Sequence, residues 1–156
     1  METGTGKTYV YLKTIMEMQR QYGFKKFIIV VPSIPIKEGV FKSLQMTVDH
    51  FNEHYPEAIY NEKSFFVYDS SDLSSVRDFA INDRLQIMVI NIQAFAKDID
   101  ESSSKTNRIL LDYNDKLGYK PISLLQNTRP FVIVDEPQST MSSPLQKKSS
   151  KNLNPL

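Results

Sequence analysis

Short apolar runs alternate along the chain with stretches in which apolar residues recur at helical spacing. The runs cover residues 27–31, 64–68, 86–91 and 130–134, and each is rich in β-branched or aromatic residues. A continuous run of this kind is typical of a strand that is covered on both faces of a sheet. The pattern therefore predicts four buried strands.

Helical spacing appears between these runs. It covers residues 9–21, 36–51 and 73–81, and the stretch 122–126 has room for a shorter helix. Strands that alternate with helices predict an α/β fold with a mostly parallel sheet and helices on both faces. In such folds ligands bind outside the carboxyl ends of the strands.

Two polar stretches carry no periodic pattern. Residues 100–107 are rich in serine and predict a surface loop. Residues 139–156 are rich in serine and lysine, contain two prolines and predict at most one more short helix. We interpret this second stretch as the C-terminal segment of the same domain.

Composition narrows the class of protein. The chain has 156 residues, the size of one domain, with 40% apolar and 24% charged residues, as in ordinary soluble proteins. It has no cysteine, which excludes disulfides and thiolate metal sites and suits a reducing cytoplasm. The apolar runs are too short to span a membrane. With 19 basic and 18 acidic residues, nucleic-acid affinity would need a local groove or a partner.

Candidate chemistry begins at the N-terminus. The residues Gly4, Thr5, Gly6, Lys7 and Thr8 stand directly before a predicted helix, although the first glycine of the full phosphate-loop motif is absent. Glycine lets the backbone curl so that its N–H groups point at phosphate oxygens. Lys7 adds a cation, and Thr8 offers a hydroxyl to Mg²⁺. This pattern predicts a nucleotide phosphate site.

An acid pair stands at the end of the fourth predicted strand. Asp135 closes the apolar run and Glu136 follows it. Hydrolysis of a phosphoanhydride needs a carboxylate near the metal and a base for the attacking water. We predict that Asp135 helps to hold Mg²⁺ and that Glu136 activates water, with Lys7 assisting phosphoryl transfer.

These motifs resemble those of a known family. Residues 3–11 (T-G-T-G-K-T-Y-V-Y) resemble motif I of the superfamily 2 helicases, and residues 135–138 (D-E-P-Q) resemble motif II as it is spelled in the restriction (Res) subunit of type III restriction-modification enzymes. Residues 27–40 resemble the motif Ia region of that family. The remaining segments that agree with the family are 65–71, 87–95, 115–118 and 152–156.

The resemblance implies a P-loop, RecA-like lobe that is incomplete. Residues 1–156 would form part of the first helicase ATP-binding domain, without the phosphate-loop strand and the motif III strand. It implies ATP and Mg²⁺ as cofactors, and a full-length protein that translocates on double-stranded DNA and cuts it with a methyltransferase (Mod) partner. Because both absent strands are central, we expect the chain alone to be unstable or prone to aggregation. Cooperative thermal unfolding of a monomer would contradict this expectation.

DNA contacts in this family come from the ends of the motif Ia strand and the strand that follows. The resemblance makes Ser33, Lys37 and Gln93 the candidates for holding DNA phosphates. An ordinary serine-proline turn beside a solvated lysine explains the same residues equally well.

Three other interpretations stay open. In the first, the chain is the ATPase lobe of another superfamily 2 DNA helicase. In the second, it is a catalytically inactive truncated gene product. Alternatively, His50, Glu53 and His54 form an H-x-x-E-H pattern, which places two imidazoles on one helix face beside a base, as in a class of zinc peptidases. Zinc lost on His50→Ala would support that third interpretation.

Overall fold

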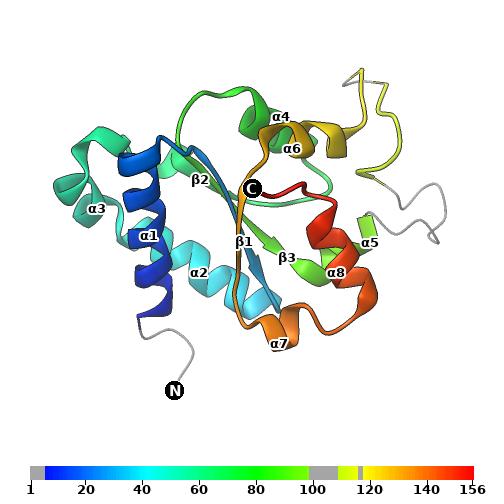
Figure 1. Cartoon of the computed structure of the whole chain (residues 1–156), viewed down its shortest axis with the longest axis horizontal. Coiled ribbons are helices and arrows are strands. Elements are labelled where there is room, and N and C mark those ends of the chain that lie inside the picture. Colours follow the sequence, from blue (N-terminus) through cyan, green and yellow to red (C-terminus); the bar gives the residue numbers. More distant parts are fainter. Residues whose placement is uncertain (1–5, 99–108, 116–117) are drawn as a thin grey trace.

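A four-stranded, all-parallel sheet forms the centre of the protein (Figure 1). The computed structural model describes residues 6–98, 109–115 and 118–156. The strands lie in the order β2-β3-β1-β4. Their bounds are β1 Lys26–Val31, β2 Phe65–Val67, β3 Gln86–Asn91 and β4 Phe131–Val134. All four predicted strands and the parallel α/β arrangement are confirmed.

Helices cover both faces of this sheet. The first face carries α1 (Lys7–Tyr22), α2 (Ile34–Met46) and α3 (Val48–His54). The second face carries α4 (Leu73–Ile81), α5 (Ile92–Asp98) and α6 (Pro121–Thr128). Two short helices after β4 and two 3-10 turns complete the set: α7 Pro137–Thr140, α8 Pro144–Lys151, η1 Pro56–Ala58 and η2 Glu62–Ser64. In the part of the chain that the structure describes, no helix is long and apolar enough to cross a membrane.

Alternate residues of the central strand feed two separate cores. Phe27 and Ile29 of β1 are fully buried against α1 and α2, on the face that also holds Leu12 and Leu44. Ile28 of β1 is buried on the opposite face with residues of α4 and α6. Because successive side chains of a strand point to opposite faces, the continuous apolar run of β1 fills both layers.

The structure corrects the predicted helix over residues 36–51, which is two helices. Thr47 separates α2 from α3, and its hydroxyl donates to the carbonyls of Ser43 (2.8 Å) and Leu44 (3.3 Å). The hydroxyl of Tyr60 donates to the same Leu44 carbonyl at 3.1 Å. These hydrogen bonds satisfy carbonyls at the end of α2. The helix can therefore end there without leaving these carbonyls unpaired.

Helices α5 and α7 were also outside the predicted set. The side chain of Asn91 accepts hydrogen bonds from the N–H groups of Gln93 (2.8 Å) and Ala94 (3.4 Å), which starts α5 directly after β3. The stretch beyond residue 139 holds α8, which is compatible with the prediction of at most one more short helix there. The polar stretch 100–107 lies outside the described residues.

A hydrogen bond between Tyr55 and Glu17 joins the end of α3 to α1. The Tyr55 hydroxyl donates to Glu17 Oε1 at 2.6 Å, and this bond is the main cause that lowers the pKa of Glu17. A carboxyl with a lowered pKa stabilises the fold above its unfolded-state pKa, and this contribution is lost as the pH falls through its folded-state pKa.

We therefore expect Tyr55→Phe to lower the thermal midpoint at pH 7 and to lower it less at pH 3. Thermal unfolding followed by circular dichroism at both pH values measures the difference. Tyr113→Phe, which removes the hydroxyl of an exposed tyrosine, is the control. An equal loss at both pH values would mean that the Tyr55 hydroxyl stabilises the fold independently of the charge on Glu17, and no loss at either pH would mean that Tyr55 acts through its ring alone.

Candidate nucleotide-binding site

The N-terminus of α1 opens at the carboxyl ends of the strands. Gly6 caps the helix in a left-handed conformation with φ 93°, and its carbonyl accepts from the N–H of Val10 at 3.0 Å. A side chain at this φ would be strained, which explains why glycine is needed here. The first N–H groups of a helix and its dipole attract anions. Gly4 and Thr5 of the predicted phosphate loop lie outside the described residues.

The acid pair is held at the end of β4. The N–H of Asp135 donates to Val30 O at 2.9 Å, which extends the ladder between β1 and β4 by one residue. Glu136 has φ 50° and ψ 67°, a conformation that non-glycine residues rarely adopt and that clusters at functional sites. Its carbonyl accepts from the N–H groups of Ser139 and Thr140, each at 2.9 Å. These bonds hold the turn that presents both carboxylates.

Thr140 is a supporting residue that sequence reasoning missed. It is fully buried, and its hydroxyl donates to the carbonyl of Asp135. Buried polar side chains are hydrogen-bonded in folded proteins. This hydrogen bond holds the backbone of Asp135 in place. A threonine five residues after an aspartate gives no sequence signal for such a contact.

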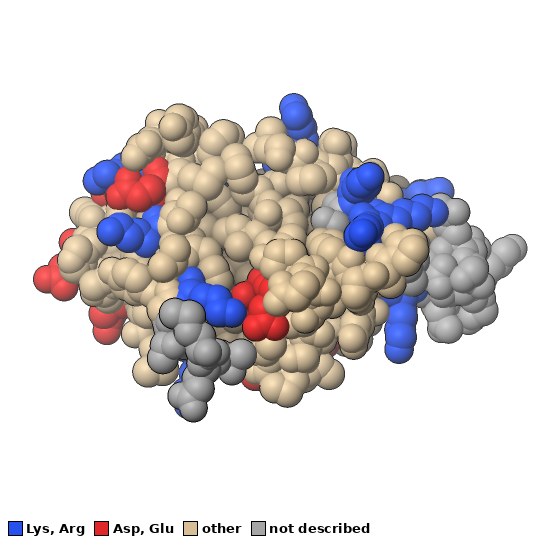
Figure 2. All heavy atoms as spheres, turned by 60° about the horizontal axis from the view of Figure 1, so that its bottom comes forward, with Lys and Arg blue, Asp and Glu red and all other residues tan. Residues whose placement is uncertain are grey.

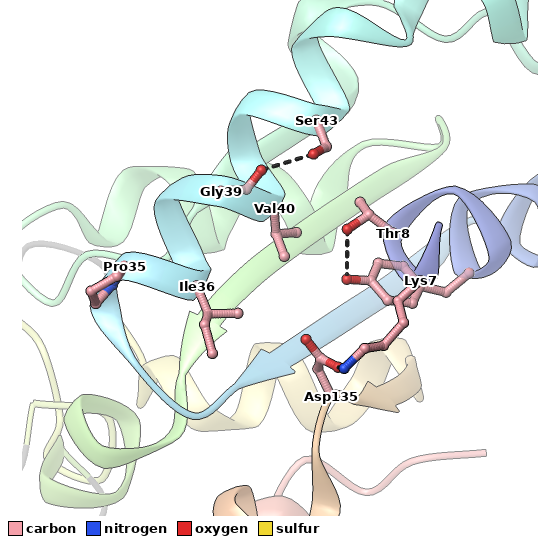
Figure 3. A pocket seen from close by; sticks show the side chains of 9 residues that line it. Lys7, Thr8, Pro35, Ile36, Gly39, Val40, Ser43 and Asp135 are labelled. Carbon is pink, nitrogen blue, oxygen red and sulfur yellow. Dashed lines mark hydrogen bonds and ion pairs between the residues drawn. The ribbon is translucent and has the colours of Figure 1, made fainter. Parts of the chain in front are cut away.

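Lys7 meets both acids across the open end of the site. Its Nζ lies 3.8 Å from Asp135 Oδ1 and 3.3 Å from Glu136 Oε1 (Figure 3 shows Lys7 and Asp135). The Lys7 side chain is 49% exposed, whereas those of Asp135 and Glu136 are 11% and 25% exposed. Figure 2 shows basic and acidic side chains in contact near the centre of the face that it presents. The ammonium end of the site is therefore more open to solvent than the two carboxylates.

Thr8 lies behind Lys7 and is nearly buried. Its Oγ1 is 3.1 Å from the hydroxyl oxygen of Tyr11, one turn further along α1. Burial raises the pKa of Tyr11, the hydrogen bond with Thr8 opposes that rise, and the negative charge of Asp135 adds to it. The Tyr11 hydroxyl is thus hydrogen-bonded to Thr8 and lies within the electrostatic field of Asp135. Sequence reasoning assigned no role to Tyr11.

Two cavities flank the Lys7–Asp135 pair. The first, of about 350 Å³, lies between α1 and α2, with Lys7, Thr8 and Asp135 on one side and apolar Ile36 and Val40 on the other (Figure 3). The second, of about 660 Å³, lies between α1 and the end of β4 and continues to Gln138. Lys7 and Asp135 line both cavities, so the pair stands at the centre of the open region.

The residues at this site suit a magnesium nucleotide. Mg²⁺ prefers hard oxygen ligands and is usually held by one or two protein oxygens together with water and phosphate. The Thr8 hydroxyl and the Asp135 carboxylate are such ligands, and both line the first cavity. The helix N-terminus and Lys7 offer the positive charge that phosphate oxygens need.

The three candidate DNA contacts lie at the same end of the sheet, and two of them, Ser33 and Lys37, interact with neighbouring residues of the fold. Ser33 caps α2 and accepts from the N–H of Ile36 at 3.5 Å. Lys37 is half-buried near Asp69 and helps to lower the pKa of that carboxyl, after the hydrogen bonds from Ser71. Gln93 is exposed in the first turn of α5. The register pairs Val31 with Asn91, so the helices that carry Ser33 and Gln93 start side by side.

The two histidines of the zinc interpretation have other partners. His50 Nε2 lies 3.0 Å from the Tyr9 hydroxyl, and His54 Nδ1 lies 2.8 Å from the His50 carbonyl. Within residues 6–98, 109–115 and 118–156, no three histidine, aspartate or glutamate side chains are grouped so that they could hold a metal. The H-x-x-E-H pattern is therefore the solvated end of α3.

Comparison with known proteins gives a consistent result. A sequence model of the family described as "Type III restriction enzyme, res subunit" matches residues 1–148. The chain is 30% identical to the EcoP15I Res subunit of Escherichia coli and 29% identical to the EcoPI Res subunit of Escherichia phage P1, each over 98% of its length. It is 36% identical over 88% of its length to the StyLTI Res subunit of Salmonella typhimurium. These alignments span 15–16% of the relatives.

Proposed function

The chain belongs to the family of type III restriction enzyme Res subunits, and from this membership we propose that it is the ATP-binding and ATP-hydrolysing lobe of a DNA translocase and endonuclease subunit. The observation that carries the proposal is the approach of Lys7 to Asp135 and to Glu136, which is 129 residues away in the sequence. A phosphate-loop lysine and a strand-end acid pair can serve one magnesium nucleotide when they meet in this way.

Phosphate binding would begin at the N-terminus of α1. Residues Gly4 to Thr8 would direct backbone N–H groups at the phosphate oxygens, and Gly6 would permit the tight turn. Lys7 would leave Asp135 and Glu136 and move to the phosphates, which carry more negative charge and offer several acceptors. The Lys7 side chain is 49% exposed, so its ammonium would stay in contact with water during this exchange.

Metal binding and water activation would fall to the other three residues. The Thr8 hydroxyl and the Asp135 carboxylate would hold Mg²⁺, which supplies positive charge that neutralises the phosphate oxygens. Glu136 would orient the attacking water and accept its proton, because its carboxylate stands at the open edge of the site once Lys7 has moved. The left-handed turn at Glu136 would keep this carboxylate apart from Asp135, so that one acid binds metal and the other binds water.

In the longer protein this ATP cycle would drive movement along double-stranded DNA, next to a methyltransferase (Mod) partner. Ser33, Lys37 and Gln93 would touch DNA phosphates, which position a protein without reading sequence. The shared edge of the sheet supports this assignment, because a change at the nucleotide would reach α2 and α5 through β1 and β3.

Equilibrium binding of a fluorescent ATP analogue tests the proposal. The wild-type chain should bind the analogue more tightly with Mg²⁺ than with EDTA, and Lys7→Ala should weaken binding by about 10- to 100-fold, the value of a lost charged hydrogen bond. Lys13→Ala removes an exposed lysine of the same helix and should leave binding unchanged. Equal affinity in wild type and Lys7→Ala would exclude the proposed phosphate site.

A further inference from the structure

Tyr11 occupies a place that the nucleotide site needs and that the phosphate-loop pattern leaves unassigned. Its ring packs against the core between α1 and α2, and its hydroxyl reaches the Thr8 hydroxyl at 3.1 Å. It also lines the 350 Å³ cavity together with Thr8 and Asp135. The packed ring leaves the hydroxyl little freedom, so its position relative to Thr8 is set by the fold.

The chemistry of a threonine ligand requires such a neighbour. A threonine hydroxyl that gives a lone pair to a cation keeps its proton, and a nearly buried O–H is costly unless an acceptor takes it. Within the described residues, Thr8 Oγ1 forms a hydrogen bond with the Tyr11 hydroxyl, and either oxygen can be the donor. The phenolic oxygen of Tyr11 can accept the Thr8 proton and so turn the Thr8 lone pairs toward the cavity.

We propose that Tyr11 is a positioning residue that orients the Thr8 hydroxyl for a divalent cation bound with the nucleotide. This inference rests on the proposed function, since it assumes that Thr8 binds the metal. Partners of metal ligands fix ligand orientation, and their loss typically lowers metal affinity by about 10- to 100-fold. Tyr11 would act only through Thr8, so its effect should appear in the metal dependence of binding and not in binding without metal.

Titration of Mg²⁺ at a fixed concentration of the fluorescent ATP analogue tests this role. Tyr11→Phe keeps the ring in the core and removes the hydroxyl. It should raise the Mg²⁺ concentration at half-saturation by about tenfold and leave the affinity in EDTA unchanged. The matched control is Tyr9→Phe, at a second tyrosine of α1. This variant removes a hydroxyl whose oxygen lies 3.0 Å from His50 Nε2 of α3. This control should titrate like wild type.

A double-variant cycle separates positioning from a general loss of structure. Thr8→Val removes the proposed ligand at nearly constant volume, and adding Tyr11→Phe to it should cost nothing further, because the two hydroxyls act as one unit. Additive losses, or a wild-type Mg²⁺ response in Tyr11→Phe, would overturn the role of Tyr11 while the nucleotide site stands. Absence of any Mg²⁺-dependent binding in wild type would overturn the proposed function and this inference with it.

Discussion

Glu136→Gln is expected to lower ATP turnover by about 10²- to 10⁴-fold, the usual contribution of a general base. Glutamine keeps the shape of the side chain but cannot accept a proton from water. The affinity for magnesium ATP should stay within a few-fold of wild type or become slightly tighter. The reason is that Glu136 Oε1 lies 3.3 Å from Lys7 Nζ and competes with phosphate for that ammonium.

Two further variants make this expectation specific. Asp135→Asn should weaken the Mg²⁺ dependence of nucleotide binding, because it alters a proposed metal ligand, whereas Glu136→Gln should leave that dependence intact. Glu62→Gln, in an exposed 3-10 turn, should match wild type in both assays. Single-turnover phosphate release measured beside equilibrium binding separates the two acids. Normal turnover in Glu136→Gln would show that Glu136 is not the general base for the attacking water.

The sheet and the ends of its strands could be predicted because the information is local. Runs such as Phe27 to Val31 are apolar throughout, and a strand buries every side chain of such a run when both faces of its sheet are covered. The approach of Lys7 to the acid pair also followed from a general rule, since parallel strands bring their carboxyl ends to one edge. The roles of Lys7, Asp135 and Glu136 remain predictions.

The parts that could not be predicted depend on contacts between distant side chains. The break at Thr47 needs a hydroxyl turned back onto Ser43 and a second hydroxyl that arrives from Tyr60. The hydrogen bond from Thr140 to the Asp135 carbonyl depends on a turn in which Glu136 is left-handed, and residue preferences do not predict a glutamate in that conformation. Periodicity reports which face of an element is buried, but it does not report which polar groups meet there.

The chain alone should hydrolyse ATP slowly, because no arginine described in the structure reaches the site. The four arginines in the described residues lie elsewhere. Arg20 pairs with Glu17 at 2.7 Å in the last turn of α1, and Arg129 lies at the amino end of β4. Arg84 precedes β3 and Arg77 is in α4, on the second face of the sheet. In phosphoryl transfer of this kind, an arginine that stabilises the transition state is worth about 10³–10⁵ in rate.

Joining the chain to a segment that supplies this arginine should therefore raise turnover by about 10³-fold or more while nucleotide affinity changes far less. The relatives offer room for such a segment, since the chain spans about a sixth of their length. Turnover should be compared between the chain and a polypeptide in which the chain is joined to the further segments of a Res relative, with each candidate arginine of the added segment replaced by alanine in turn. One such variant should return turnover to the level of the chain alone. Full turnover by the 156-residue chain would contradict this expectation, and no turnover in the longer polypeptide would favour a catalytically inactive product.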